Sequence, residues 1–264
     1  MKEIVVMETD KDYLDKSFKE LRIKHFMDVV EVGLKNQDPK QQLVTIDLLK
    51  RCCDKEKTER RSSQIVSKIK SAKFRQVQTV EQFDFSHSQL TKRIEKTYLM
   101  IHNNVDKNSL PKAIFVGNPG VGKTHLARSL GYSSCQKGLS VLFLTAAEMA
   151  NGLIQAQKLA FLEREIAPLK KPQVLIIDEL GYVDFDVQAS QLFFQVISAR
   201  HDAGLGLVVT TNLNFSQFNQ IFANEAVATV VVDRMVNEAE IFYMEGESYR
   251  KHQRTLKNKA DKKA

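Results

Sequence analysis

The chain has 264 residues, of which 43% are hydrophobic, and its formal net charge is +7. This length can hold one large domain and a small one with a proper core. No run approaches the roughly 18–20 consecutive apolar residues of a membrane span, and the start becomes charged too soon for a signal peptide. We therefore expect a globular cytoplasmic protein that has no membrane partner.

The first part of the chain has the apolar spacing of a small helical domain. Residues 12–34 and 41–53 place apolar side chains at near-helical intervals. Residues 54–75 are rich in charge, which predicts an exposed helix or arm that leads into a linker near residues 76–85. We place a boundary at about residue 75, so that residues 1–75 form a helical N-terminal domain with a basic arm.

Positive charge collects in two segments. Residues 50–75 carry ten Lys or Arg against three Asp or Glu, and a basic C-terminal tail at residues 250–264 carries seven against one. Such segments suggest contacts with the phosphate backbone of a nucleic acid, whereas a solvated helical face and a charged tail explain them equally well. The candidate DNA-binding residues are Lys50, Arg51, Arg60, Arg61, Lys68, Lys70, Lys73 and Arg75.

Beyond residue 75, short apolar runs alternate with longer helical patterns. The runs occupy residues 113–117, 140–146, 174–179, 206–212 and 240–244. Continuous Val, Ile, Leu and Phe without alternation is typical of strands buried on both faces, and helices between such strands imply right-handed crossovers. The pattern predicts an α/β domain over residues 76–249, in which a parallel sheet has helices on both faces.

The first run leads into a phosphate-binding loop. Residues 117–125, GNPGVGKTH, fit the pattern G-x-x-x-x-G-K-[ST], with a strand before it and a helical pattern after it. Its glycines let backbone N–H groups face the phosphates, Lys123 contacts the outer phosphates, and Thr124 ligates magnesium. The predicted nucleotide-binding residues are Gly117, Asn118, Pro119, Gly120, Val121, Gly122, Lys123, Thr124 and His125.

Two acidic residues end the third run. Asp178 ends a buried strand beside the loop and is expected to hold the magnesium ion through water. Glu179 follows directly and places a second carboxylate where it polarises an attacking water, which fits hydrolysis better than transfer to a small-molecule acceptor. A solvated loop acid is the alternative interpretation of Glu179.

Two later residues complete the predicted site. Asn212 ends the fourth run on the ligand side of the sheet and is expected to contact the γ-phosphate or the lytic water, although strand ends are often Thr or Asn for turn reasons. Arg234 lies too far along the chain to belong to its own loop, so it is our candidate arginine finger for a neighbouring subunit. The alternative for Arg234 is an ion pair with Asp233 or another nearby acid.

These motifs follow one another in a specific order over nearly the whole chain. Together they resemble the IstB family, the ATPase helper proteins of insertion-sequence transposition, and more widely the DnaC-type helicase loaders of the AAA+ class. The pieces that carry the resemblance are FKELRIKHF, TVEQFDFS, GNPGVGKTHLA, LIIDELGY, QLFFQVISARHDAG, VVTTN, VVDRM and GESYR. The resemblance implies ATP and Mg²⁺ as cofactors, Walker A at residues 117–124, Walker B at Asp178 and Glu179, a first sensor at Asn212 and the finger at Arg234.

The resemblance also bears on two other segments. Residues 146–171 resemble an insertion that acts as a wedge and biases subunits toward a helical filament instead of a flat ring. One more amphipathic crossover helix is the alternative for this insertion. About twenty residues follow the last run, too few for a helical lid domain. We therefore expect no C-terminal lid, with Arg250 as a possible second sensor.

Three functions remain open from the sequence. The leading one is an ATP-hydrolysing factor that assembles into an ATP-bridged homo-oligomer on double-stranded DNA without sequence preference. This assembly prepares target DNA and recruits or stimulates a cognate transposase. Hydrolysis of ATP then disassembles the complex. A replicative helicase loader is the alternative, but few aromatic residues lie near the basic segments to stack on single-stranded bases. An ATP-gated interaction module without turnover is the third, and the presence of Glu179 counts against it.

Overall fold

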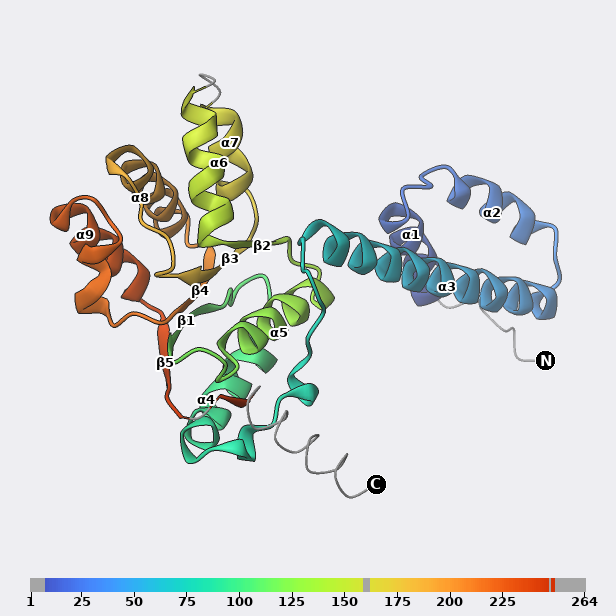
Figure 1. Ribbon diagram of the computed structural model, residues 1–264. Coiled ribbons are helices and arrows are strands. Elements are labelled where there is room, and N and C mark those ends of the chain that lie inside the picture. The colour runs from blue at the N-terminus through green and yellow to red at the C-terminus, as the bar shows by residue number, and fades with distance from the viewer. Residues whose placement is uncertain (1–7, 159–161, 247, 250–264) are drawn as a thin grey trace, which may run out of the picture. The chain divides into compact units, whose positions relative to one another are not determined.

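The computed structural model describes residues 8–158, 162–246, 248 and 249. Contacts within the chain divide it into two compact units, Met1–Val66 and Ser67–Ala264. Figure 1 shows the helices and strands of both units. Within the part of the chain that the structure describes, no helix combines the length and apolar character needed to cross a membrane.

The first unit is helical, as the sequence predicts. It contains α1 (Glu8–Glu20), α2 (Phe26–Lys35) and most of α3 (Pro39–Ser71). Pro39 occupies the first position of α3, where a backbone N–H is not needed, and the carboxylate of Asp38 accepts hydrogen bonds from the N–H groups of Lys40 and Gln41. The buried residues of this small core are Leu14, Phe18, Leu21, Leu34, Ile46 and Cys53.

The second unit is built on a parallel sheet, which confirms the predicted α/β class. Its strands are β1 (Lys112–Gly117), β2 (Val141–Thr145), β3 (Val174–Leu180), β4 (Gly206–Thr211) and β5 (Glu240–Met244). The spatial order is β2-β3-β4-β1-β5, and every neighbouring pair is parallel. All strands therefore end at the same edge, so that the loops after β1, β3 and β4 meet there.

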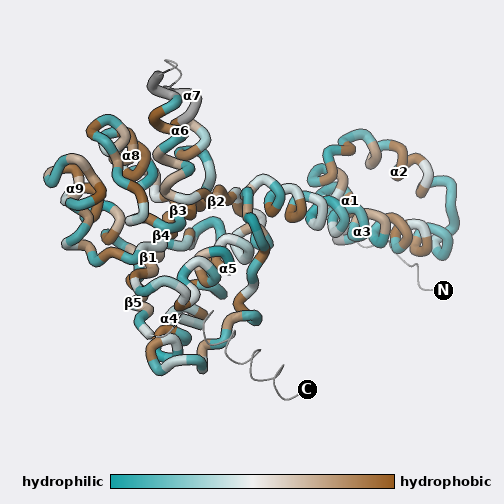
Figure 2. The backbone as a smooth tube through the Cα atoms, viewed as in Figure 1, coloured by the Kyte–Doolittle hydropathy of each residue, from teal (hydrophilic) through white to brown (hydrophobic). Residues whose placement is uncertain are grey.

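Helices cover both faces of this sheet. One face carries α4 (Gln89–Asn104) and α5 (Lys123–Gln136), and the other carries α6 (Ala146–Lys158), α7 (Leu162–Lys170), α8 (Val187–Asp202) and α9 (Glu225–Val236) (Figure 1). Hydrophobic and hydrophilic residues alternate along these helices in Figure 2, as expected for helices that bury one side against a core. The strands between the two layers are buried on both faces, which explains their continuous apolar runs.

The two compact units divide inside α3, between Val66 and Ser67, whereas the sequence placed a boundary near residue 75. The difference arises because the chain just after α3 packs against the α/β core. Ala72 is fully buried, and its carbonyl oxygen accepts a hydrogen bond of 2.9 Å from the N–H of Phe143 on β2. Phe74 packs its ring 5.9 Å from that of Phe143. The domain assignment itself stays a prediction, and residues 250–264 lie outside the described residues.

The insertion at residues 146–171 contains two described helices, α6 and α7, instead of a single crossover helix. Both pack on the same face of the sheet, through Met149 and Leu153 of α6 and Ile166 and Leu169 of α7. Their role as a wedge between subunits stays a prediction. After β5, the described residues extend to Tyr249 and contain no lid domain.

Candidate nucleotide-binding site

The loop after β1 has backbone conformations that only glycine adopts readily. Gly117 has φ +153° and Gly122 has φ +103°. A Cβ atom on Gly117 would lie 1.8 Å from the carbonyl oxygen of Met244 on β5, and one on Gly122 would lie 2.4 Å from the Phe83 ring. Gly122 then caps α5, so the first N–H groups of this helix and its positive dipole end face the space above the loop.

Lys123 and Thr124 begin α5 and point toward this space. The ammonium group of Lys123 lies inside the curve of the loop, where it donates hydrogen bonds to the carbonyl oxygens of Gly117 (2.7 Å) and Asn118 (2.8 Å). The hydroxyl of Thr124 donates a hydrogen bond of 2.9 Å to Oδ1 of Asp178. Since its proton is directed to Asp178, the lone pairs of the Thr124 oxygen remain available to a metal ion.

The acidic pair ends β3 with two different environments. Asp178 is 2% exposed, whereas Glu179 is exposed. Glu179 has φ +62°, a left-handed conformation that is uncommon for a residue with a Cβ atom. Successive side chains of a regular strand point to opposite faces of the sheet. The left-handed conformation of Glu179 breaks this alternation, and both acidic side chains line the same pocket. The structure thus brings together Lys123, Thr124, Asp178 and Glu179, as the sequence predicts.

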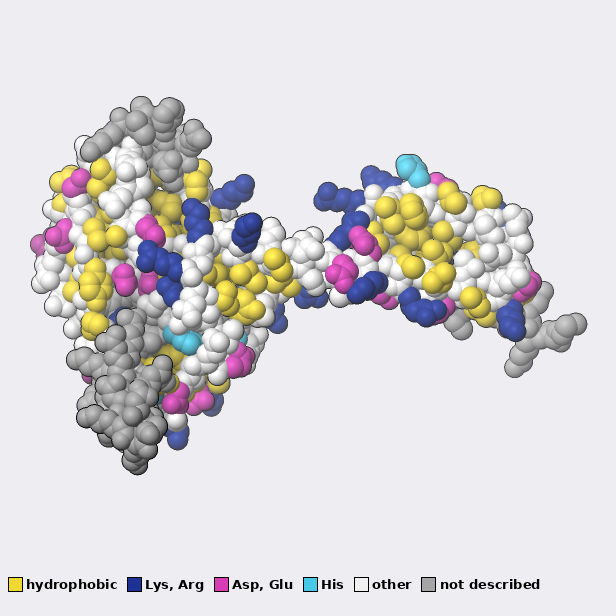
Figure 3. Space-filling model, turned by 45° about the vertical axis from the view of Figure 1, so that its right-hand side comes forward, with side chains coloured by type: hydrophobic (Ala, Val, Ile, Leu, Met, Phe, Trp, Pro, Cys, Tyr) yellow, Lys and Arg dark blue, Asp and Glu magenta, His cyan; other side chains and the backbone are white. Residues whose placement is uncertain are grey.

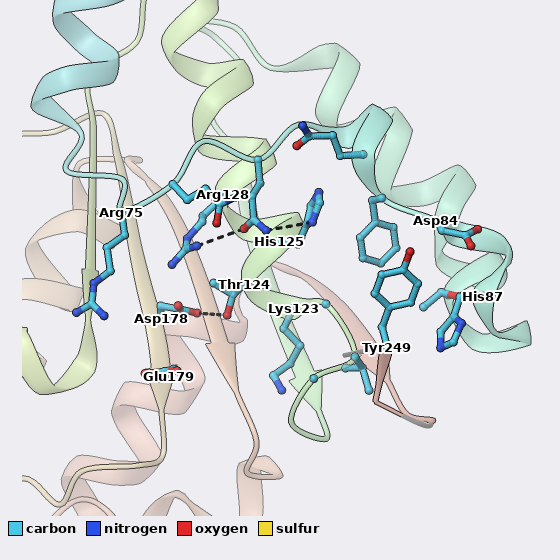
Figure 4. A pocket seen from close by; sticks show the side chains of 18 of the residues that line it. Arg75, Asp84, His87, Lys123, Thr124, His125, Arg128, Asp178, Glu179 and Tyr249 are labelled. Atoms are coloured by element: carbon cyan, nitrogen blue, oxygen red, sulfur yellow. Dashed lines mark hydrogen bonds between the residues drawn. The ribbon is translucent and has the colours of Figure 1, made fainter. Parts of the chain in front are cut away.

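A pocket of about 480 Å³ opens above the loop, within the range of about 300–1,000 Å³ that small-molecule sites occupy. In Figure 4, Asp178 and Glu179 lie at one end of this pocket, Lys123 lies in the middle, and Asp84, His87 and Tyr249 lie at the other end. The first end has the charges that a metal-bound phosphate chain requires. The sequence did not predict Asp84, His87 and Tyr249 at the second end, nor Gln82, Phe83 and Thr91, which also line the pocket.

The linker before α4 is tied to α5 by His125. Nε2 of His125 donates a hydrogen bond of 2.8 Å to the carbonyl oxygen of Thr79, so Nδ1 is the acceptor for the amide of Gln78 at 3.3 Å. Burial lowers the pKa of His125, which favours the neutral ring that this pattern requires. The ring of Phe83 packs edge-on against it at 5.3 Å. His125, predicted as a nucleotide contact, lines the pocket and also positions the linker.

The segment after β5 forms another wall of the pocket. The backbone N–H of Tyr249 donates a hydrogen bond of 3.0 Å to the carbonyl oxygen of Gly120, and its ring packs edge-on against His87 at 4.8 Å. The side chain of Ser248 also lies against Gly120. The motif GESYR held the only signal for this wall in the sequence. Arg250, the predicted second sensor, lies outside the described residues.

Asn212 lies just past the end of β4, but it does not line the pocket. Its side-chain oxygen is buried and accepts no hydrogen bond from the described residues. This oxygen lies close to the residue that follows β3, because a Cβ atom on Gly181 would come within 2.7 Å of it. A buried acceptor without a partner is suited to a water molecule or another donor. The sensor role of Asn212 stays a prediction.

Arg234 lies at the opposite edge of the sheet. It lines a small cavity with Lys112 and Leu207, which stand at the beginnings of β1 and β4. The length of β1, roughly 17 Å, therefore separates it from its own loop. Its guanidinium lies 3.4 Å from the carboxylate of Asp202 and over the ring of Phe194 at 5.4 Å. The ion pair considered from the sequence is thus present, with Asp202 as the acid, and the finger role stays a prediction.

The predicted DNA-binding cations fall into two groups. Lys50 pairs with Asp10, Arg51 with Asp47, Arg60 with Glu56, and Arg75 with Glu148 at the rim of the nucleotide pocket. No ion pair with a described acid is found for Arg61, Lys68, Lys70 or Lys73. Figure 3 shows Lys and Arg side chains on the surface of both units, interspersed with acidic ones. Binding of DNA by these residues stays a prediction.

The site and the sheet define a P-loop protein with the AAA+ fold. The defining features are the phosphate-binding loop after β1, the acidic pair near the end of β3 and the strand order β2-β3-β4-β1-β5. Solved structures share this fold. The DnaC helicase loader matches with a TM-score of 0.56 at 19% identity, covering 64% of this chain and 96% of that chain. DnaI matches with a TM-score of 0.55 at 18% identity, covering 65% of this chain and 89% of that chain.

The family is defined by sequence. The model of the IstB-like ATP binding protein family matches residues 16–257, and the chain belongs to this family. The insertion sequence IS5376 putative ATP-binding protein of Geobacillus stearothermophilus is 32% identical over 216 residues, which are 82% of this chain and 85% of the relative. The insertion sequence IS21 putative ATP-binding protein of Pseudomonas aeruginosa is 31% identical over 230 residues, 87% of this chain and 85% of the relative.

Proposed function

We propose that the protein binds ATP with Mg²⁺ and hydrolyses it. The observation that carries this proposal is the contact of 2.9 Å between the Thr124 hydroxyl and Asp178, beside the buried ammonium group of Lys123. The residues present fit the metal ion, because a hydroxyl and a carboxylate at the mouth of a phosphate-binding loop are oxygen ligands of the kind that Mg²⁺ prefers. When bound, the ion neutralises charge that develops on the phosphates.

The protein's own residues have separate roles in the proposed reaction. Lys123 and the first N–H groups of α5 hold the phosphate chain, and Asp178 with Thr124 holds the metal ion. Glu179 accepts the proton of the attacking water, because its carboxylate is exposed to the pocket and needs no partner in the fold. Phe83 and Tyr249, which line the same pocket, provide aromatic surface for the adenine ring of ATP.

The enzymatic part of the proposal is tested with Glu179→Gln, and with Glu240→Gln as the matched control. Glu240 is an exposed glutamate at the beginning of β5, away from the phosphate loop. We expect Glu179→Gln to bind a fluorescent ATP analogue with Mg²⁺ as the wild type does, while phosphate release falls by about 100-fold or more. Wild-type turnover in Glu179→Gln would exclude Glu179 as the base. Absence of turnover in the wild type, with or without DNA, would exclude hydrolysis.

We further propose that the site is completed by a neighbouring copy through Arg234, in an assembly on double-stranded DNA. The position of Arg234 at the far edge of the sheet supports this arrangement, because the side chain cannot reach its own nucleotide. A mixing experiment tests it. Lys123→Ala lacks the phosphate contact and Arg234→Ala lacks the finger, but a mixture contains interfaces in which one chain supplies each. We expect each variant to be inactive alone and the mixture to recover turnover; a mixture as inactive as its components would remove Arg234 from this role.

DNA binding is proposed to rest on the cations that have no ion pair with a described acid. Lys70 and Arg51 are both exposed cations on α3. Arg51 serves as the control, because it is already paired with Asp47 at 2.7 Å. Removal of a phosphate contact lowers the salt dependence of DNA affinity by about one unit of the log–log slope. We expect this decrease for Lys70→Ala and a smaller one for Arg51→Ala. Equal slopes in both variants and the wild type would remove Lys70 from the DNA interface.

A role in transposition is favoured over helicase loading by the extent of sequence identity. The relatives whose names refer to insertion sequences are about 30% identical over most of this chain, whereas the likeness to the DnaC helicase loader is one of fold. We propose that the assembly prepares target DNA and recruits or stimulates a transposase. Sedimentation with and without ATP and duplex DNA tests the assembly, and a protein that stays monomeric throughout would contradict it. A transposase reading frame beside the gene supports the partner, whereas a replication operon favours the loader.

A further inference from the structure

A buried hydroxyl on β4 contacts both acidic residues of the nucleotide site. Thr210 is 1% exposed. Its hydroxyl donates a hydrogen bond of 2.5 Å to Oδ1 of Asp178 and accepts one of 2.9 Å from the backbone N–H of Glu179. We infer that Thr210 is a positioning residue for hydrolysis: it fixes the metal-binding carboxylate of Asp178 and aims the side chain of Glu179. This inference rests on the proposed ATP hydrolysis.

The sheet explains why a hydroxyl is needed at this position. Ile177 lies opposite Val209 and Leu180 opposite Thr211, so Asp178 and Glu179 share Thr210 as their partner across the strands. Two residues facing one form a β-bulge, which leaves the inserted residue without its ladder hydrogen bond. The inserted N–H of Glu179 would be unpaired at the edge of the core, and the Thr210 oxygen accepts it instead.

The same contact supports the uncommon backbone conformation of Glu179. A left-handed residue with a Cβ atom persists where surrounding interactions hold it, and such residues cluster at functional sites. With φ at +62°, Glu179 leaves the strand pattern and its side chain faces the pocket. Loss of the Thr210 acceptor would free the backbone of Glu179 to return to ordinary strand geometry, in which the carboxylate is displaced from the attacking water.

The hydroxyl proton serves Asp178. Oδ1 of Asp178 accepts from both Thr124 and Thr210, so its orientation is set from two elements, α5 and β4. Groups that hydrogen-bond a metal-binding carboxylate orient it, and their removal typically lowers metal affinity by about 10–100-fold. Thr210 therefore affects both the metal-binding carboxylate and the catalytic carboxylate, although it does not itself line the nucleotide pocket. A purely structural hydroxyl in the core would affect only stability.

The test uses two substitutions of Thr210 and a matched control. Thr210→Val keeps the shape of the side chain and removes the hydroxyl, and Thr210→Ser keeps the hydroxyl. Ser190→Ala is the control, because Ser190 is fully buried and its hydroxyl also donates one hydrogen bond, to Phe185, and accepts one, from Ala223. Ser190 does not line the nucleotide pocket. Thr210→Ala provides a second variant without a hydroxyl in case the valine variant does not fold.

We expect kcat for ATP hydrolysis to fall by about 100-fold in Thr210→Val with KM changed less than about threefold, because misplacement of the base acts on the chemical step. Thr210→Ser should recover activity to within about threefold of the wild type, and Ser190→Ala should lose stability but not turnover. The second readout is nucleotide affinity with and without Mg²⁺, measured with a fluorescent ATP analogue. The gain in affinity that Mg²⁺ provides should fall by about tenfold in Thr210→Val.

The outcomes separate this inference from the proposed function. A wild type without Mg²⁺-dependent nucleotide binding or turnover would overturn the proposed function, and the role of Thr210 with it. A wild type that hydrolyses ATP, with Thr210→Val or Thr210→Ala equal to it in kcat and in the effect of Mg²⁺, would overturn the role of Thr210 alone. Equal losses in Thr210→Val and Ser190→Ala, or a serine variant as inactive as the valine variant, would do the same.

Discussion

Replacement of Gly117 by alanine is expected to be the most damaging small change in the phosphate-binding loop. Its new Cβ atom would lie 1.8 Å from the carbonyl oxygen of Met244 and 2.6 Å from the carbonyl carbon. Both atoms belong to the backbone of β5, which pairs with β1 at this position, so no side chain can rotate away. Relief of the clash requires β5 to separate from β1. This separation displaces the segment after β5, in which Tyr249 contacts the phosphate-binding loop.

The magnitude follows from three terms. A residue with a Cβ atom at φ +153° costs about 1–3 kcal/mol in backbone strain, and the backbone clash adds about 1–3 kcal/mol, as overpacking does in a filled core. The lower entropy of alanine in the unfolded chain returns only about 0.4–1 kcal/mol. The net loss is about 1–5.5 kcal/mol, a substantial part of the roughly 5–15 kcal/mol that stabilises a domain.

Two other glycines separate these terms. Gly138 has φ +82° but no heavy atom within 4 Å of a Cβ position, so alanine there meets the backbone strain of about 1–2 kcal/mol without a clash. Gly152, inside α6, also has open space and an ordinary φ, so alanine should stabilise by about 0.5–1 kcal/mol. The expected order of stability is Gly152→Ala, wild type, Gly138→Ala, Gly117→Ala.

The assay is urea denaturation of the full chain followed by circular dichroism, with affinity for a fluorescent ATP analogue measured under native conditions. We expect Gly117→Ala to lose nucleotide affinity by about tenfold or more, because the loop and the segment after β5 move together, while Gly138→Ala keeps it. A Gly117→Ala variant no less stable than Gly138→Ala would refute the reasoning, since both variants carry backbone strain and only Gly117→Ala carries the clash with Met244.

Two further predictions concern stability and pH. Arg200 is 1% exposed and donates hydrogen bonds to the carbonyl oxygens of Leu169, Pro172, Gln173 and Gly206, while burial lowers its pKa to about 10. Arg200→Met should therefore cost about 2–4 kcal/mol in urea denaturation, because carbonyl groups lose their donor; a loss below about 1 kcal/mol would contradict this. Burial also lowers the pKa of His125 in the folded protein, so His125 binds a proton more readily in the unfolded chain. The stability that neutral His125 contributes is therefore present above about pH 6.5 and is lost as the pH falls below that value. The decrease in Tm from about pH 7.5 to 5.5 should be smaller in His125→Gln than in the wild type, and an equal decrease would assign the effect to other groups.

The strands could be predicted from the sequence because burial on both faces leaves a local trace. The run at residues 240–244 coincides with β5 (Glu240–Met244), and the run at 174–179 ends one residue before β3 (Val174–Leu180) does. The phosphate-binding loop could also be predicted from the sequence, since the loop and the helix after it are contiguous in the chain. Asp178 could be placed near Thr124 in advance, because the carboxyl ends of parallel strands meet at one edge of the sheet.

The second end of the pocket could not be predicted in this way. Phe83 and Tyr249 come from opposite sides of the core in sequence, and nothing in their local spacing indicates that β5 lies next to β1. The packing of the segment after α3 could not be predicted for a similar reason, because Ala72 contacts β2 across a long stretch of chain. Charge counts were misleading in another way: the acid that neutralises Lys50 is Asp10, which lies on a different helix.

The position of β5 also explains how the end of the described chain comes to line the nucleotide pocket. Because β5 is the edge strand beside β1, the chain that leaves it at Met244 emerges directly next to the phosphate-binding loop. A few residues then suffice to bring Tyr249 onto the carbonyl of Gly120 and against His87 from the linker. The two segments that flank the strands of the core, one before β1 and one after β5, therefore meet over the loop. The order of the strands in the sheet therefore determines which segments line this part of the pocket.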